Sequence, residues 1–350
     1  MLTSPTRRAA IDPAAFATGW YLAAWSAELG PNAVLPLRYF GRDYVLFRGD
    51  DGQATLLDAH CPHLGAHLGH GGRVEGTEIV CPFHAWRFGA TGQCTRVPYS
   101  AHTPQRARVR AYPVREHGGM ILAFFGPEDR APDYEVPVID ELSDAAWTPL
   151  EKSELEVKTQ AREVIENIAD RAHFYPVHNT KIDDFEVTID GPRATQRSVG
   201  KGRNLKGEKI DVESVATYHG PAVQITRLAW AMPMVLINAH VPVDANTLRL
   251  RFAVSVRAGV GVELPRPLLD ALVAAPRNGY FQDVAIWEHK LWRDTPMLVQ
   301  GDGPIMKVRA WYAKFFEVLQ PGACRRRPAP ATRSTSSCPS PGARWMPWVT

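Results

Sequence analysis

The amino-acid sequence predicts an α+β protein in which an all-β N-terminal domain is followed by an α+β domain built on an antiparallel sheet. Short apolar or alternating runs, separated by glycine-containing turns, fill the first 130 residues and are typical of short strands. Four longer strand-like runs follow one another between residues 211 and 256. Apolar residues at helical spacing occur on either side of them, at 162–174 and 277–292.

The expected elements follow in order along the chain. Residues 1–17 form an N-terminal extension, 18–128 the first domain, 129–320 the second domain and 321–350 a tail. The strands expected in the first domain are Trp20–Trp25, Tyr44–Phe47, Ala54–Leu57 and Met120–Phe125, and the proline-rich stretch 127–137 indicates a linker. The second domain is expected to hold a strand at 154–160, a helix at 162–174, strands around 211–218, 222–231, 234–243 and 247–256, and a helix at 277–292.

Composition and charge exclude several classes of protein. Hydrophobic residues make up 45% of the chain and charged residues 22%, as in globular proteins with a real core. The net charge of +3 includes five arginines in the tail, so the remaining chain carries −2 and offers no electrostatic basis for binding nucleic acid. The tail also holds six prolines and no acidic residue, a composition typical of disorder.

Membrane and secretory segments are not expected either. No run of 18 apolar residues occurs, so no membrane span is predicted, and the N-terminus lacks the apolar core of a secretory signal. The five cysteines are an odd number, and two of them lie in the tail. A disulfide framework is therefore not expected, and the sequence favours the cytoplasm.

Two cysteines and two histidines form a metal-ligand pattern in the first domain. Cys61-Pro-His63 is followed after 17 residues by Cys81-Pro-Phe-His84. A Cys₂His₂ set is also a zinc set, so structural zinc is the rival interpretation. An iron–sulfur cluster is favoured because each loop supplies one cysteine and one histidine, and because small residues and prolines let backbone N–H groups approach the sulfurs.

A second pattern lies in the second domain. Asp170, His173 and His178 follow one another closely, and Pro176 is expected to end the helix so that His178 folds back toward His173. Two imidazoles and a carboxylate form the facial triad of non-haem Fe(II) oxygenases. The candidates for a more distant carboxylate ligand are Asp283, Glu288 and Asp294.

Both patterns resemble a known family. Residues 61–66 (Cys-Pro-His-Leu-Gly-Ala) and 81–88 resemble the Rieske [2Fe–2S] motif, although Ala85 stands where most relatives have glycine. Residues 167–178 (Asn-x₂-Asp-x₂-His-x₄-His) resemble the iron motif of Rieske-type oxygenase α-subunits, and 282–290 resemble the ligand helix of the 3-ketosteroid 9α-hydroxylase and cholesterol 7-desaturase group.

The resemblance implies a Rieske domain followed by a helix-grip catalytic domain, with two metal sites. It implies that Cys61, His63, Cys81 and His84 bind the cluster and that His173, His178 and Asp283 bind a mononuclear Fe(II). Asp170, with Asn167 in the same motif, would act catalytically by relaying electrons between the centres and orienting a ligand imidazole.

The implied function is that of the terminal oxygenase component of a monooxygenase. A separate NAD(P)H-dependent reductase or a ferredoxin would supply electrons, because the chain has no G-x-G-x-x-G fingerprint. O₂ would then attack an apolar, steroid-like substrate, and three α-subunits would form a ring. The alternatives are a sterol desaturase, an oxygenase or demethylase of a smaller aromatic substrate, and an electron carrier that uses only the Rieske domain.

Overall fold

The computed structural model describes residues 16–128 and 130–316. The described residues belong to one compact unit. Residues 1–15 of the expected extension and the whole expected tail, 321–350, lie outside the described residues. Within the described part, no helix combines the length and the hydropathy that a membrane crossing requires.

The first domain is all-β, as predicted. It contains three small antiparallel sheets, in the strand orders β1-β11-β10, β2-β3-β4-β9 and β5-β6-β7-β8. Their strands are β1 (Gly19–Trp25), β2 (Val34–Tyr39), β3 (Arg42–Arg48), β4 (Ala54–Asp58), β5 (Arg73–Glu75), β6 (Glu78–Val80), β7 (Arg87–Phe88), β8 (Cys94–Arg96), β9 (Ala111–Tyr112), β10 (Val114–His117) and β11 (Met120–Phe125). All four strands expected in this domain are present.

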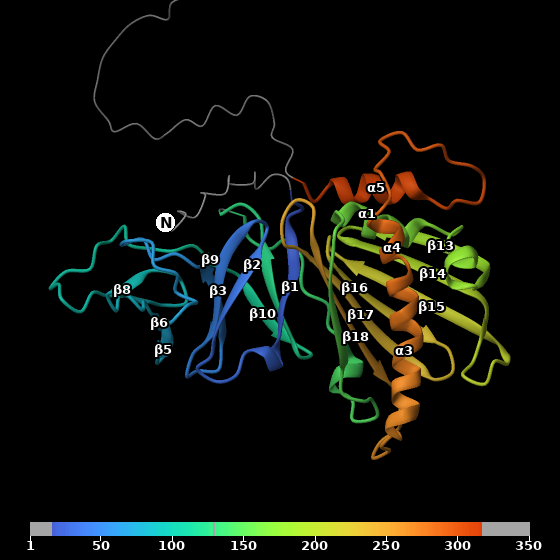
Figure 1. The fold of residues 1–350 in the computed structure, drawn as a ribbon, viewed down its shortest axis with the longest axis horizontal. Coiled ribbons are helices and arrows are strands. Elements are labelled where there is room, and N and C mark those ends of the chain that lie inside the picture. Colours follow the sequence, from blue (N-terminus) through green and yellow to red (C-terminus); the bar gives the residue numbers. More distant parts are fainter. Residues whose placement is uncertain (1–15, 129, 317–350) are drawn as a thin grey trace, which may run out of the picture. The chain divides into compact units, whose positions relative to one another are not determined.

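The pair formed by β1 and β11 connects the two domains. Every residue of these strands is buried, which requires apolar partners on both faces. One face, with Tyr21 and Phe125, packs into the core of the first domain. The other face, with Trp20 and Phe124, packs against strands of the second domain. Figure 1 shows β1 between the strands of the first domain and the large sheet.

The second domain is a seven-stranded antiparallel sheet in the order β12-β18-β17-β16-β15-β14-β13. Its strands are β12 (Glu151–Val157), β13 (Lys181–Asp190), β14 (Arg193–Arg203), β15 (Lys209–His219), β16 (Val223–Ala229), β17 (Pro233–Pro242) and β18 (Leu248–Val256). Helix α3 (Arg266–Gln282) lies across one face, whereas α1 (Ala161–Glu166) and α5 (Ile305–Ala313) lie side by side near one end (Figure 1). The predicted α+β class with an antiparallel sheet is thus confirmed.

Two expected helices differ from the structure. The helix expected at 162–174 ends at Glu166, continues as a 3-10 turn to Ala169 and gives way to extended backbone at Asp170. A second short helix, α2 (Phe174–His178), follows. The helix expected at 277–292 begins at Arg266, ends as α3 at Gln282 and is followed by the short α4 (Val284–Trp287). Asp283 joins α3 to α4 with helical backbone angles.

A buried arginine links the two domains by charge. Arg251 on β18 is only 2% exposed. Its Nη1 lies 2.6 Å from Glu28 Oε2 of the first domain, and its Nη2 lies 3.3 Å from Glu154 Oε2 on β12. Glu28 is itself held, because its Oε2 accepts a hydrogen bond from the backbone N–H of Trp25. A buried charge with such partners is costly to disturb.

We predict that Arg251→Met destabilises the protein by about 2 kcal/mol, because Glu28 and Glu154 lose their charge-assisted hydrogen bonds to a buried arginine. The matched control is Arg197→Met, which removes an exposed cross-strand arginine that contacts Glu213 and Asp184. This control should cost less than about 1 kcal/mol. Urea unfolding of the two variants measures both effects, and equal losses would contradict the account.

Candidate metal centres and the cavity beside them

Two similar loops carry the cysteines and histidines of the first domain. In the first loop, Gly65 N–H donates to the carbonyl of Cys61 at 2.9 Å. In the second, Ala85 N–H donates to the carbonyl of Cys81 at 3.1 Å. Gly65 and Ala85 both have left-handed backbone, with φ of 78° and 57°. Ala85 therefore adopts a conformation that suits glycine, and each loop turns its cysteine and histidine toward those of the other.

The four side chains are arranged with sulfur inside and nitrogen outside. Cys61 and Cys81 are free thiols, each 2% exposed. His63 and His84 are only half-buried, and their ring centroids lie 4.6 Å apart. The His63 ring stacks on Trp86, and its Nδ1 is buried with no hydrogen-bond partner. An orphaned imidazole nitrogen among two thiols and a second imidazole fits a metal centre.

The pairing of these ligands favours a cluster over a single ion. Burial, helped by the neighbouring Cys81, raises the pKa of the Cys61 thiol to about 11, so a cation is needed to hold it as thiolate. A tetrahedral zinc ion draws all four ligand atoms to within about 4 Å of one another. The two buried thiols contact each other, and the two half-buried imidazoles lie side by side. This pairing fits a binuclear cluster with sulfur on one iron and imidazole on the other.

A second donor set lies in the second domain. One ligand atom from each of His173, His178 and Asp283 lies within 4.8 Å of the others. His178 Nε2 is 3.4 Å from Asp283 Oδ1, and the two imidazole centroids are 5.1 Å apart. Asp283 is 5% exposed. Two imidazoles and one buried carboxylate match the facial triad that non-haem Fe(II) sites use.

The local reason for this geometry differs from the one that the sequence suggested. Pro176 does not end the helix but lies inside α2, in the first turn, where its missing N–H breaks no bond. Helical backbone is interrupted instead at Asp170, whose Oδ1 accepts hydrogen bonds from the N–H groups of Ala172 and His173. His173 is the N-cap of α2, and Asn179, in left-handed backbone, is its C-cap.

Neighbouring side chains determine which imidazole nitrogens are free. His178 Nδ1 lies 3.0 Å from Gln282 Oε1, which leaves Nε2 for a metal. His173 Nδ1 faces Asp170 Oδ2 at 3.7 Å. Burial disfavours the charged form of Asp170, yet the nearby His173 imidazole and the backbone N–H groups of Ala172 and His173 outweigh it and lower the pKa of Asp170. Contacts of this kind orient ligands and select their tautomers.

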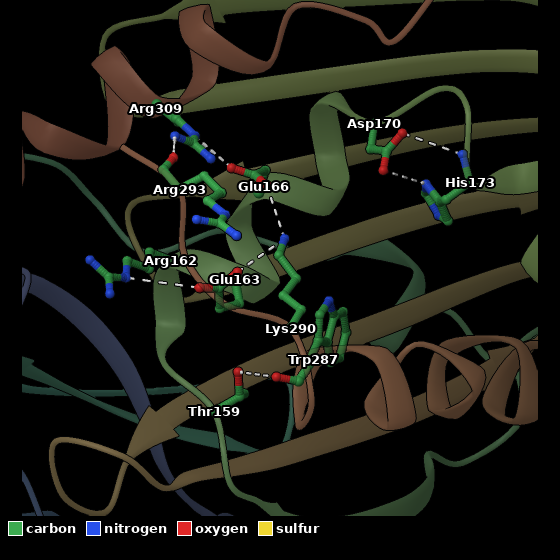
Figure 2. A network of polar contacts seen from close by, with 10 residues as sticks. All are labelled: Thr159, Arg162, Glu163, Glu166, Asp170, His173, Trp287, Lys290, Arg293 and Arg309. Atoms are coloured by element: carbon green, nitrogen blue, oxygen red, sulfur yellow. Dashed lines mark hydrogen bonds and ion pairs between the residues drawn. The ribbon is translucent and has the colours of Figure 1, made fainter. Parts of the chain in front are cut away.

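An ion-pair network holds the segment that supports Asp283. Asn167 Nδ2 donates to Asp283 Oδ2 at 2.8 Å, and Asn167 directly follows Glu166. Figure 2 shows Lys290 between Glu163 and Glu166, at 3.0 and 2.9 Å, and Arg309 of α5 against Glu166 at 2.6 Å. The network fixes the end of α1 against α5 and the chain after α4, and so positions the Asn167 amide.

The triad opens onto a cavity with two compartments. The inner compartment, of about 170 Å³, is lined by all three triad residues. The outer compartment, of about 460 Å³, includes His178, Leu228 and Trp230 in its wall. The two share Phe174, His178, Ser214, Pro276 and Tyr280. Together they are of the size that proteins use for small organic ligands.

The other candidate ligands lie elsewhere. Glu288 accepts a hydrogen bond from the Lys158 N–H, and Asp294 accepts one from Trp292 Nε1. Gln282 was not expected at the site, although its position beside Asp283 in the sequence could have suggested it. The polar residues on the inner face of the sheet, such as Gln196 and Asn238, were also missed, because their place depends on strand register.

Comparison with known proteins identifies the family. Residues 19–113 match the Rieske [2Fe–2S] domain, and residues 123–316 match the 3-ketosteroid 9α-hydroxylase C-terminal domain. The chain belongs to the 3-ketosteroid 9α-hydroxylase family of Rieske oxygenases. It is a Rieske-type oxygenase component with a [2Fe–2S] cluster and a mononuclear non-haem iron, and such a component works with a separate reductase.

Individual relatives cover most of the chain. A probable 3-ketosteroid-9-alpha-monooxygenase oxygenase component from Rhodococcus rhodochrous is 32% identical over 87% of this chain and 81% of its own length. A cholesterol 7-desaturase from Caenorhabditis elegans is 29% identical over 90% of this chain and 80% of its own. Dicamba monooxygenase bound to dicamba shares the fold, with a TM-score of 0.70 and 20% identity over 85% of this chain and 96% of its own.

We predict that Ala85→Gly stabilises the first domain by about 1 kcal/mol, because glycine accepts left-handed backbone without a steric penalty. The reciprocal variant, Gly65→Ala, should lose about 1 kcal/mol. An added Cβ at Gly65 meets no atom within 4 Å, so this loss would report backbone strain alone. The thermal midpoint for loss of cluster absorbance measures both, and shifts of the same sign would contradict the prediction.

Two aspartates should respond differently to substitution. Asp283→Ala should lose most of the mononuclear iron but keep the cluster, because a ligand is removed. Asp170→Asn should keep both centres and slow turnover by about 10-fold or more, since the amide lacks the charge that faces His173. Iron analysis, cluster absorbance and coupled turnover separate the two effects. Equal iron loss in both variants would show that the roles are assigned wrongly.

Proposed function

We propose that this chain hydroxylates a steroid-like substrate, with the cluster held by Cys61, His63, Cys81 and His84 and the mononuclear iron held by His173, His178 and Asp283. The observation that carries the proposal is the position of this triad in the wall of a two-compartment cavity. The matched relatives are named for action on 3-ketosteroids, which supports the substrate class.

Hydroxylation requires O₂, two electrons and two protons, and releases water. The cluster, when bound, stores one electron at a time, and the mononuclear iron supplies the chemistry that activates O₂. The chain's own residues arrange the site. Asn167 holds Asp283 Oδ2, so that Oδ1 faces the two imidazoles. All three donors line the inner compartment, so a metal held by them would be next to the cavity.

The outer compartment suits a flat apolar molecule. Its wall includes Ile182, Val212, Leu228, Trp230 and Pro276, which form broad apolar surfaces. Of the run 228–237, Leu228, Trp230 and Leu236 line the cavity, whereas the remaining large apolar residues pack in the core. Fused rings could therefore lie between α3 and the sheet, with one edge of the ring system facing the triad.

Desaturation of a sterol is the second candidate reaction. A relative named cholesterol 7-desaturase is similar over 90% of this chain, and the same triad would serve either outcome. The two reactions differ in whether oxygen is retained in the product. A smaller aromatic substrate has less support, since likeness to dicamba monooxygenase at 20% identity concerns the fold.

Assembly as a homotrimer is also part of the proposal. Leu64 and Phe83, beside the cluster histidines, are 64% and 60% exposed, and Tyr175, between the iron histidines, is 66% exposed. Exposed large apolar side chains around two redox centres favour contact between subunits, so that the cluster of one chain would face Asp170 of the next. We also assign the enzyme to the cytoplasm, where NAD(P)H feeds the reductase.

Reconstitution tests the function. The chain, with a reductase, NADH or NADPH and ¹⁸O₂, should convert a 3-ketosteroid to a product with one labelled hydroxyl group. The His173→Ala variant is the control and should retain cluster reduction without product. An unlabelled product with a new double bond would favour desaturation. Rapid cluster reduction without oxygen consumption for any steroid would identify an electron carrier and contradict the proposal.

A further inference from the structure

Three polar atoms in the inner compartment lack partners. They are Gln196 Nε2, Asn238 Oδ1 and the Tyr280 hydroxyl, and all three are buried without a hydrogen bond. Gln196 and Asn238 are 5% and 8% exposed. All three residues line the same compartment as the iron triad. Buried polar groups in proteins are almost always paired, so two unpaired donors and one unpaired acceptor in one cavity indicate that polar ligand atoms and water enter it.

The register of the sheet explains why these side chains share one face. Gln196 on β14 pairs with Ala216, which pairs with Thr226 and then Leu236 across the sheet. In the adjoining row, Tyr218 pairs with Gln224 and Gln224 with Asn238. Residues paired directly across strands, and every second residue along them, lie on the same face. Both rows line the inner compartment.

Tyr280 contributes to the same compartment from α3, which covers this face of the sheet. It lies on α3, and its ring stacks on Phe252 of β18 at a centroid distance of 5.6 Å. The Asn238 amide is held in place, because its Nδ2 donates to Gln224 Oε1 at 2.8 Å. Its Oδ1 has no hydrogen-bond partner. The sheet and α3 thus both direct polar atoms into the inner compartment. A purely apolar ligand would leave these atoms without hydrogen bonds.

We propose that the inner compartment binds a ketone oxygen of the steroid through hydrogen bonds donated by Gln196 Nε2 and the Tyr280 hydroxyl, while Asn238 Oδ1, which can only accept, pairs with a water molecule. This inference rests on the proposed steroid substrate and adds an orientation to it. The end of the ring system that carries this ketone lies in the inner compartment, and the remaining rings lie in the outer compartment. The oxygen then determines which carbon faces the triad. Gln196 is a specificity-determining residue in this arrangement.

The test uses the holoenzyme with its reductase and three steroids. One is a 3,17-diketone, and the other two each lack one of its ketones. In the wild type, one of the two steroids with a single ketone should bind at least 10-fold more weakly than the diketone, because the buried donors lose their acceptor. The other analogue should bind like the diketone. Titration gives Kd, and product analysis gives the hydroxylated position.

Substitution connects that loss to Gln196. Gln196→Leu should weaken the diketone at least 10-fold but should not weaken the affected analogue further, as in a double-mutant cycle. Tyr280→Phe should show the same pattern and keeps the test valid if Gln196→Leu fails to fold, as judged by cluster absorbance and iron content. The control is Thr195→Val, next to Gln196 on β14 but on the other face of the sheet, where its hydroxyl contacts that of Thr217. This variant should preserve the discrimination.

The outcomes separate this inference from the proposed function. Steroids that are bound and hydroxylated with no difference between the diketone and both analogues would overturn the inference and leave the function intact. A wild-type enzyme that binds no steroid would refute the substrate class, and the inference with it. Discrimination that persists unchanged in both Gln196→Leu and Tyr280→Phe would overturn the assignment of these residues.

Discussion

Asp283 is a carboxylate that is 5% exposed and lies where α3 meets α4. A buried charge is tolerated only when it is paired and hydrogen-bonded. Asp283 has both kinds of partner, since His178 Nε2 is 3.4 Å from Oδ1 and Asn167 Nδ2 donates to Oδ2. Burial disfavours a charged imidazole, but Asp283 and Gln282 outweigh it and raise the pKa of His178. Two segments distant in the sequence, 167–178 and 282–283, thus meet at one carboxylate.

The surrounding structure maintains this meeting point. The ion pairs from Lys290 and Arg309 to Glu166 hold the end of α1 next to Asn167. α3 lies across the sheet (Figure 1). Its residues Pro276 and Tyr280 line the cavity, and Asp283 directly follows its last residue. The cluster loops belong to a different domain, which is joined to the sheet through β1, β11 and the Arg251 contacts. The chemistry can therefore be divided between an electron-storing domain and a substrate-binding domain.

Features that depend on local sequence could be predicted. The Cys/His loops and the two iron histidines are compact motifs, and Asp283 could be chosen over Glu288 only through resemblance, because its place depends on a long-range contact. β14 was hidden because Ala194 and Val199 are its only apolar residues, whereas β13 alternates from Phe185 to Asp190 and could have been predicted. Pro276 and Gly279 hid the continuity of α3. The polar inner wall of the cavity was not predictable, because it arises from the register of four strands.

We expect His173, His178 and Asp283 together to hold one iron at the wall of the cavity. Anomalous diffraction at the iron edge from crystals of the oxygenase would locate this iron. It should show one isolated peak within about 2.3 Å of a nitrogen of each histidine and an oxygen of Asp283, apart from the cluster peaks near Cys61 and Cys81. A fully iron-loaded crystal with no peak among these three side chains, or with the peak on Asp170, Glu288 or Asp294, would contradict it.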